Sequence, residues 1–319
     1  MRVVDEHEGI GLRGGLHVAA PRLWLNGDTR HGVGFLAAYD PRRRTRSRVL
    51  CTPTVAAMLG PGQGAPLAVA WGRPFRLGRL AVELLPAGSS VGAAVLRFWH
   101  QGRVFLDLGA GRLDTTPSAP ALALEPCDVA LVDASLATTS LSDVAGLRRW
   151  LLAAVAGFGP GACTVVCSQP TVALDILCLL EGMGPIYANR SLEALAGRGR
   201  AAGVRLPPLR RLPSTSPEGG VVLWAGPVLR PLDESPARDL PRLLVAPRAD
   251  AADVAAVGAA GGIAFSRRAS GLEVDAIVEA SGAHEVIVWG AGAAALCARL
   301  GLGGLACWHL VEDAQLELV

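Results

Sequence analysis

The strongest constraint on the fold is a change of pattern near Ala137. Before this residue, short apolar runs are separated by tight turns, which is typical of antiparallel strands. After it, runs of strand length alternate with stretches of helical periodicity, as in Val144–Phe158 followed by Cys163–Cys167. Such alternation predicts a parallel sheet covered by helices. The chain is therefore expected to be α/β, with a strand-rich start.

The pattern also predicts where the elements lie. Before Ala137 we expect strands at Leu16–Ala19, Leu23–Leu25, Gly32–Ala38, Val49–Cys51, Leu67–Trp71, Leu80–Leu85, Ala94–Trp99, Val104–Leu108 and Cys127–Val132, and a helix at Thr52–Leu59. After it we expect helices at Val144–Phe158, Val172–Glu181, Leu192–Ala201, Ala251–Ala260, Val274–Ser281 and Ala293–Leu300. The later strands are expected at Cys163–Cys167, Ile186–Asn189, Val221–Trp224, Leu243–Ala246, Ile263–Ser266, Glu285–Trp289 and Leu305–Val311. A hairpin turn is expected at Gln101–Arg103, and a loop at Leu206–Gly220.

Composition excludes several classes of function. All 30 basic residues are arginine, so no lysine is available as a Schiff-base nucleophile or a P-loop lysine. A net charge of +2 does not by itself imply a polyanionic partner. The seven cysteines include no CxxC pair, and the charged N-terminus has no signal-peptide pattern. We therefore expect reduced thiols, a cytoplasmic location and no membrane partner, because no apolar run is long enough to span a bilayer.

An ordered series of short motifs resembles one known family along nearly the whole chain. The motifs are Gly15–His17, Leu23–Asn26, Val33–Pro41, Leu50–Thr54, Pro86–Ser89, Val104–Gly109, Leu131–Ala137, Gly184–Tyr187, Arg200–Pro208, Ala264–Ser270 and Ile287–Gly290. Together they resemble the metallo-β-lactamase/β-CASP nucleases, in the branch of the bacterial ligase-associated DNA exonucleases and the mRNA 3′-end processing factors. The resemblance implies an αββα sandwich interrupted by a small inserted α/β domain. The implied boundaries are 1–139 and 242–319 for the sandwich and 140–241 for the insert.

The positions that bind metal ions in this family have been replaced here. The family's histidines and carboxylates correspond to Asn26, Leu36, Ala38, Asp40, Pro41, Ser89, Ala110, Arg268 and Trp289. Of these, only Asp40 keeps the residue type of the family. A two-metal hydrolase needs several histidine and carboxylate ligands to hold its ions and generate hydroxide. The resemblance therefore implies an inactive site without metal or cofactor, in which Trp289 fills the vacated space.

An inactive member of this family is expected to act through a partner. By resemblance, the chain is the non-catalytic subunit or scaffold of a DNA-repair or RNA-processing assembly, paired with an active nuclease of the same family. A hydrolase with a rewired, metal-independent site around Asp40 and Ser89 or Ser90 is the alternative. A stand-alone module that binds nucleic acid is a third hypothesis.

Arginines cluster where ligands are lost. Arg42, Arg43 and Arg44 directly follow Val33–Pro41, the segment that stands where the family carries its metal-binding motif HxHxDH. Arg267 and Arg268 lie in the segment Ala264–Ser270, where the family has one of its last metal-binding histidines. Guanidinium groups at the rim of the former metal site would grip phosphate without hydrolysing it. A solvated surface loop explains the same residues, so both interpretations stay open.

Three further motifs have simple structural explanations. Gly88–Gly92 matches the GxSxG nucleophile elbow, with Ser90 as nucleophile, but a turn of small residues is the better explanation, because a hairpin and not a helix is expected to follow. Val286–Leu296 resembles a dinucleotide fingerprint, with Glu312 and Asp313 at the expected distance, although no further βα unit follows. The cluster from Asp5 to Glu8 contains potential metal ligands that are expected to be exposed.

Overall fold

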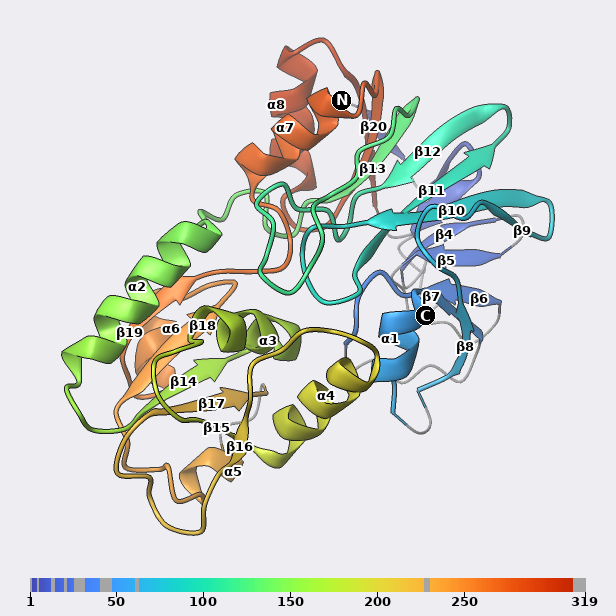
Figure 1. Cartoon of the computed structure of the whole chain (residues 1–319). Helices are drawn as coiled ribbons and strands as arrows, with labels where there is room; N and C mark the ends of the chain where they lie inside the picture. Colours follow the sequence, from blue (N-terminus) through green and yellow to red (C-terminus); the bar gives the residue numbers. More distant parts are fainter. Residues whose placement is uncertain are drawn as a thin grey trace, which may run out of the picture. The chain divides into compact units, whose positions relative to one another are not determined.

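The computed structural model describes residues 2–4, 6–12, 15–19, 22–25, 32–40, 48–60, 63–226 and 230–311. It confirms the α/β class, and it divides the chain into two compact units (Figure 1). The first unit combines Met1–Leu113, Ala121–Thr138 and Arg268–Val319. The second unit combines Asp114–Pro120 and Thr139–Arg267. Both ends of the chain thus belong to the first unit.

Two sheets form the frame of the first unit. One has the strand order β2-β3-β4-β5-β6-β7-β8, and the other has the order β1-β21-β20-β13-β12-β11-β10-β9. The strands of the first sheet are β2 (Glu6–His7), β3 (Ile10–Leu12), β4 (Leu16–Val18), β5 (Leu23–Leu25), β6 (Val33–Phe35), β7 (Arg48–Cys51) and β8 (Ala65–Ala68). The strands of the second are β1 (Arg2–Val4), β9 (Phe75–Leu77), β10 (Leu80–Pro86), β11 (Ala94–His100), β12 (Arg103–Asp107), β13 (Val129–Asp133), β20 (Glu285–Trp289) and β21 (Ala306–Leu310).

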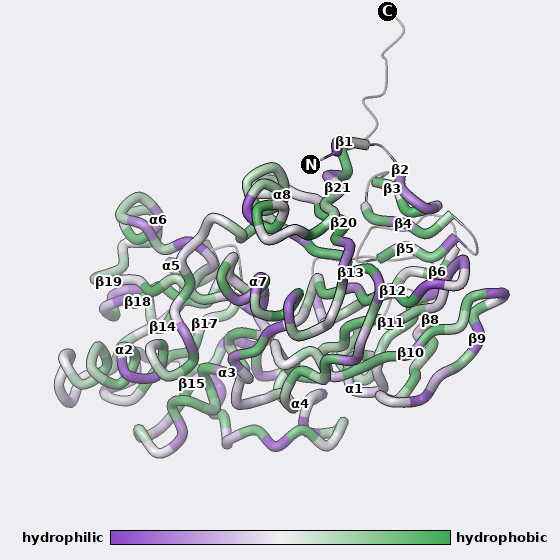
Figure 2. Tube along the Cα trace, turned by 90° about the horizontal axis from the view of Figure 1, so that it is seen from above, coloured by the Kyte–Doolittle hydropathy of each residue, from purple (hydrophilic) through white to green (hydrophobic). Residues whose placement is uncertain are grey.

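The two sheets share one hydrophobic core, to which Leu25 and Phe35 contribute from one sheet and Phe98 and Phe105 from the other. Figure 2 shows hydrophobic residues along β10 and β11 and hydrophilic residues on β9. Helices α7 (Gly271–Ala280) and α8 (Ala293–Leu302) follow β19 and β20, and α8 packs on β20 and β21. Helix α1 (Pro53–Met58) covers the outer face of the other sheet, where Val55 packs on β7.

The second unit contains a sheet in which every strand pair is parallel, in the order β16-β15-β17-β14-β18-β19. Its strands are β14 (Cys163–Cys167), β15 (Ile186–Ala188), β16 (Arg210–Arg211), β17 (Val221–Ala225), β18 (Arg242–Ala246) and β19 (Ala259–Ala264). Its helices are α2 (Val144–Gly157), α3 (Pro170–Leu179), α4 (Arg190–Ala201), α5 (Arg230–Asp233) and α6 (Ala251–Ala256). Helix α3 packs on β14 and β17, and α4 packs on β15, β16 and β17.

Local sequence explains most element boundaries. The turn between β11 and β12 has positive φ angles at Gln101 (50°) and Gly102 (78°), the geometry of a two-residue hairpin loop. Side chains of Asp143, Asn189 and Asp250 accept hydrogen bonds from the first turns of α2, α4 and α6. The expected hairpin and the expected alternation of strands and helices are therefore confirmed.

Several segments differ from the sequence-based prediction. Strands β1, β2, β3, β9 and β16 were not expected, and β16 lies within the loop expected at Leu206–Gly220. Arg242–Arg267, which we expected to return to the first unit, belongs to the second, because β18 pairs with β14 and β19 pairs with β18. The helix expected at Ala251–Ala260 ends at Ala256, because Gly258 adopts a left-handed φ of 62° and a strand begins at Ala259.

The described residues include no helix that is both long and apolar enough to cross a membrane.

Candidate functional site

Two of the positions that the resemblance marks as former metal-binding positions, Ala110 and Trp289, lie at one end of the larger sheet. Strands β12, β13 and β20 run parallel, so their carboxyl ends lie together. Ala110 follows β12, Asp133 ends β13 and Trp289 ends β20. Backbone hydrogen bonds connect the loops at this edge, including Ala134 N to Trp289 O at 2.8 Å. We call this group of loops the carboxyl-end site.

An ion pair occupies the centre of the carboxyl-end site. Arg268 Nη1 lies 2.8 Å from Asp133 Oδ2, and the Asp133 side chain is only 13% exposed. Asp133 Oδ1 also accepts hydrogen bonds from Ser135 N at 2.9 Å and Ser135 Oγ at 2.5 Å. Gly290 makes this arrangement possible, because a Cβ there would lie 2.9 Å from Ser135 Oγ. The carboxylate that ends β13 is thus already bound by groups of the chain itself.

A second guanidinium group is buried two residues after Ala110. Arg112 is 1% exposed, and its Nε lies 3.7 Å from Glu273 Oε1. Glu273 also belongs to the capping box that starts α7, together with Ser270. Asp107, which is equally buried, accepts a hydrogen bond from Gly109 N at 3.0 Å. A buried arginine needs such partners, because an unpaired charge is very unfavourable away from water.

The loop between β10 and β11 places two serine hydroxyls inside the protein. Ser89 and Ser90 are both 0% exposed, and among the described residues neither Oγ atom has a hydrogen-bond partner. Gly88 allows this loop to pass the loop after β12: its φ is +76°, and a Cβ there would lie 2.1 Å from Arg112 O. Strands β10 and β11 are antiparallel, and no helix follows Ser90, so the geometry of a nucleophile elbow is absent.

Most of the remaining described positions lie on the loop after β6. Ala37 O accepts a hydrogen bond from Ala94 N at 2.7 Å, and Ala38 joins the main core. Asp40 is half-buried, and Trp289 packs partly buried against the same core. Leu36 instead joins the small cluster beneath α1, together with Val49, Cys51 and Val55.

A small pocket remains at the carboxyl-end site. Leu108, Val132, Val274 and Ile277 supply its apolar walls, and Asp133 and Arg268 supply its polar wall. Its mixed lining offers one fixed positive charge that already has a counter-ion.

Some expected residues cannot be placed. Asn26, Pro41, Arg42, Arg43 and Arg44 lie outside the described residues, as do Asp5, Glu312 and Asp313. Arg267 belongs to the second unit, where its backbone N lies 3.5 Å from Gln169 Oε1. Arg268 is therefore the one member of the expected phosphate-binding set that the structure places at the carboxyl-end site.

The opposite end of the same strands carries a compact charged network. Arg103 begins β12 and Glu285 begins β20, and Arg103 Nη2 lies 2.5 Å from Glu285 Oε2. Arg103 also donates to Glu8, and His7 Nε2 lies 2.5 Å from Glu285 Oε1. His7 stacks on Trp308 with ring centroids 3.8 Å apart. We call His7, Glu8, Arg103 and Glu285 the amino-end network.

Within the described part of the chain, His7, Glu8 and Glu285 form the group of three side chains close enough to share a metal ion. However, the Arg103 guanidinium already bridges the two carboxylates. Burial alone would raise the pKa of Glu285, but the hydrogen bonds from Arg103 and His7 lower it overall. Burial likewise opposes the charge of Arg103, yet Glu285 and Glu8 raise its pKa. The network therefore contains its own cation.

Sequence reasoning did not identify Arg112, Asp133, Glu273 and Glu285 as site residues. Asp133 carried a usable signal, since it ends a buried apolar run within the motif Leu131–Ala137. Arg112 carried none, because a single arginine after a glycine-rich turn normally lies in solvent. Val286–Leu296 covers most of β20 and the start of α8, and β21 follows.

Comparisons with known proteins support the fold alone. No protein-family model matches the chain. No curated protein matches it either. Among solved structures, it is similar to a crystal structure of a protein of unknown function from Enterococcus faecalis V583, with 11% sequence identity and a TM-score of 0.56. The similarity covers 82% of this chain and 76% of that protein.

Proposed function

We propose that this chain is a catalytically inactive relative of the metallo-β-lactamase/β-CASP nucleases. It acts as the non-catalytic subunit or scaffold of a nucleic-acid-processing complex and pairs with an active nuclease. The observation that carries this proposal is the ion pair between Arg268 and Asp133 at the carboxyl-end site.

The chemistry of this pair argues for a structural role. A guanidinium supplies positive charge but has no open coordination position, so it cannot bind and activate water as a metal ion does. Arg112 and Glu273 repeat the arrangement in the interior of the same unit. Two arginine–carboxylate pairs thus stand at the loops where a two-metal hydrolase of this family would hold its ions.

The rewired hydrolase is the weaker candidate. It requires a serine hydroxyl that can reach a substrate, and Ser89 and Ser90 are fully buried. It also requires a general base near that hydroxyl. Asp40 is half-buried on the loop after β6, and no histidine of the described residues contributes to these loops. The scaffold role needs none of these groups.

The test combines isolation with reconstitution. The tagged full chain is recovered from its native extract, and every protein recovered in stoichiometric amount is identified, purified and mixed with it again. We expect a metal-binding nuclease of the same fold that re-forms a complex and supplies all of the nuclease activity. Recovery of the chain as a lone monomer, or nuclease activity of the purified chain itself, would contradict the proposal.

A further inference from the structure

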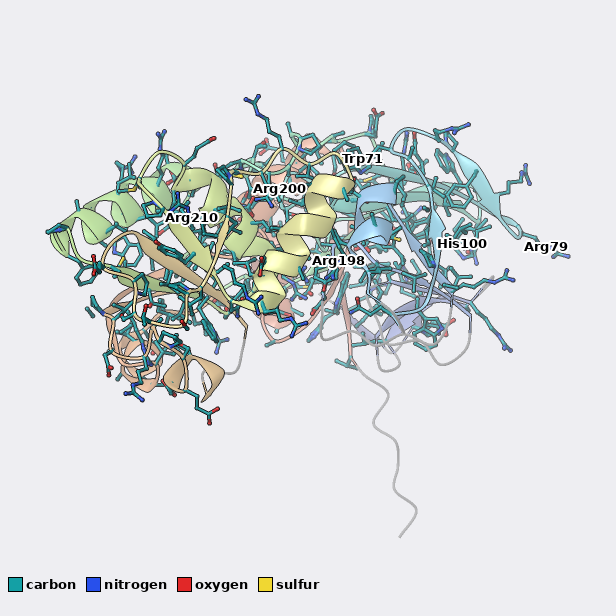
Figure 3. All side chains as sticks on the ribbon, turned by 60° about the horizontal axis from the view of Figure 1, so that its bottom comes forward. Trp71, Arg79, His100, Arg198, Arg200 and Arg210 are labelled. Atoms are coloured by element: carbon teal, nitrogen blue, oxygen red, sulfur yellow. The ribbon has the colours of Figure 1, made fainter. Side chains whose placement is uncertain are left out.

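The segment from Arg198 to Arg211 in the second unit carries five arginines and no acidic residue. The residues are Arg198, Arg200, Arg205, Arg210 and Arg211, and we call them the arginine edge. Along the chain, the nearest acidic residues on either side are Glu193 and Glu218. Arg198 and Arg200 belong to the last turn of α4, and Arg210 lies on β16 (Figure 3). A net charge of only +2 for the whole chain makes this concentration of charge notable.

Three of these guanidinium groups are available to a ligand. Arg205, Arg210 and Arg211 are exposed, and no carboxylate among the described residues pairs with them. Arg200 has a different role, because it donates hydrogen bonds to Leu206 O at 3.4 Å and to Pro207 O. The charges of Arg205, Arg210 and Arg211 are therefore not neutralised by a carboxylate of the described residues.

The backbone that carries these arginines is held in one conformation. Helix α4 ends in a left-handed turn at Gly203, whose φ is +84°, and Val204 N donates to Gly199 O at 3.0 Å. The Arg200 side chain donates a hydrogen bond to Pro207 O and so holds the segment between α4 and β16 in place. Strand β16 finally pairs with β15, with Arg210 opposite Tyr187. A ligand consequently meets a preordered surface, which lowers the entropy cost of binding.

The arginines follow the chain along the edge of the sheet, and Arg210 and Arg211, as neighbours on a strand, point to opposite faces of it. Strand β16 is the edge strand of its sheet, and its other side has no neighbouring strand in the described residues. A fully extended chain from Arg205 to Arg211 would span at most roughly 20 Å. One strand of a nucleic acid duplex places a phosphate about every 3.4 Å, so this length faces several consecutive phosphates. Arginine also suits phosphate because its planar fork donates two parallel hydrogen bonds.

Structural explanations account for only part of the arginine edge. Cations in the last turn of a helix favour its dipole, which explains Arg198 and Arg200. Charged residues on an edge strand prevent pairing with other chains, which explains one charge on β16. Neither explanation requires Arg205, or two adjacent arginines on a strand this short.

We propose that the arginine edge binds the phosphate backbone of a nucleic acid, without reading its bases. An acidic protein is the less suitable partner, because protein surfaces seldom present an unbroken line of anions. This inference goes beyond the proposed function, and it stands whether or not the first unit proves inactive.

The test measures binding of the full chain to fluorescently labelled duplex DNA, single-stranded DNA and RNA by anisotropy, over a range of salt. The test variant replaces Arg205, Arg210 and Arg211 by alanine. The control variant removes the same total charge from the exposed arginines of the β9 region: Arg73, Arg76 and Arg79. A third variant replaces the same three test positions by lysine. Thermal unfolding of each variant checks that the fold is intact.

We expect the test variant to bind at least about tenfold more weakly at low salt, and its salt dependence for duplex DNA to fall by about 2 to 3 in log–log slope. The control and lysine variants should keep most of the wild-type slope. Equal losses in the test and control variants would show an effect of net charge alone and overturn the proposal. Absence of binding by the wild type, or full competition by poly-glutamate at matched charge, would overturn it too.

Discussion

Replacing Glu285 by glutamine is expected to destabilise the first unit by about 2–3 kcal/mol. The Glu285 carboxylate is 12% exposed and contacts Arg103 and His7, which are 25% and 16% exposed. Removing one partner of a fully buried ion pair costs about 3–5 kcal/mol, whereas an exposed pair contributes about 0–1 kcal/mol. The amino-end network lies between these limits and nearer to the buried one. Glutamine keeps the shape of the side chain and removes its charge.

Denaturant unfolding of the two proteins measures this difference directly. For a unit of this size, the change corresponds to a decrease in Tm of roughly 4–12 °C. Glu279→Gln is the matched control, because Glu279 is exposed on α7 and its replacement should change stability by less than about 0.5 kcal/mol. A Glu285→Gln variant as stable as this control would refute the reasoning about the network.

The same pair of proteins tests the pKa of Glu285. Because that pKa is lowered in the folded chain, the carboxylate contributes stability above the pKa of the unfolded chain. The contribution is lost as pH falls through the folded pKa. The stability difference between wild type and Glu285→Gln should thus be constant near neutrality and shrink below about pH 4. A difference that grows on acidification would contradict the sign of this shift.

Three other changes test separate parts of the structure. Gly88→Ala should lower the free energy of unfolding by at least about 2 kcal/mol, because φ is positive and a Cβ would lie 2.1 Å from Arg112 O. A change below about 0.5 kcal/mol would contradict the close approach of the β10–β11 loop to the loop after β12. Arg268→Ala should cost about 1–2 kcal/mol in denaturant unfolding, because Asp133 loses its counter-ion; unchanged stability would indicate that the pair contributes nothing. Thiol labelling near pH 8 should be much slower in the folded than in the unfolded chain, because burial raises the pKa of Cys51 to about 12 and that of Cys163 to about 11; equal labelling rates would contradict this burial.

The fold class followed from local pattern because periodicity depends on near neighbours. The alternation after Ala137 reflects helices such as α2 and strands such as β14, and both lie close to their predicted bounds. Short strands such as β2 and β9 gave no such signal, since two or three residues cannot display a period. The residue at which the second unit ends could not be predicted either, because it depends on the pairing of β18 with β14, which lie far apart in the sequence.

The candidate site was predictable where a motif kept its neighbours and unpredictable where a long-range contact defines it. Ala110 and Trp289, which were singled out through their flanking residues, follow β12 and end β20, whose carboxyl ends lie at the same end of the sheet. Arg112 pairs with Glu273, which lies far away in the chain, and no local sequence pattern predicts this contact. The amino-end network shows the same limit: His7 looked like part of an exposed cluster until Glu285 was placed beside it.

The most direct test of the central claim is metal content measured together with nuclease activity. Purified protein, first freed of metal, is supplied with Zn²⁺ and Mn²⁺ and compared with the Glu285→Gln and Asp133→Ala variants. Glu285→Gln removes any metal that binds at the amino-end network, and Asp133→Ala removes any metal at the carboxyl-end site. The account predicts that the carboxyl-end site holds no stoichiometric metal and that no nucleic acid is cleaved. Two results would contradict the account. One is metal binding that is lost in Asp133→Ala but kept in Glu285→Gln, and the other is nuclease activity that is lost in Asp40→Ala.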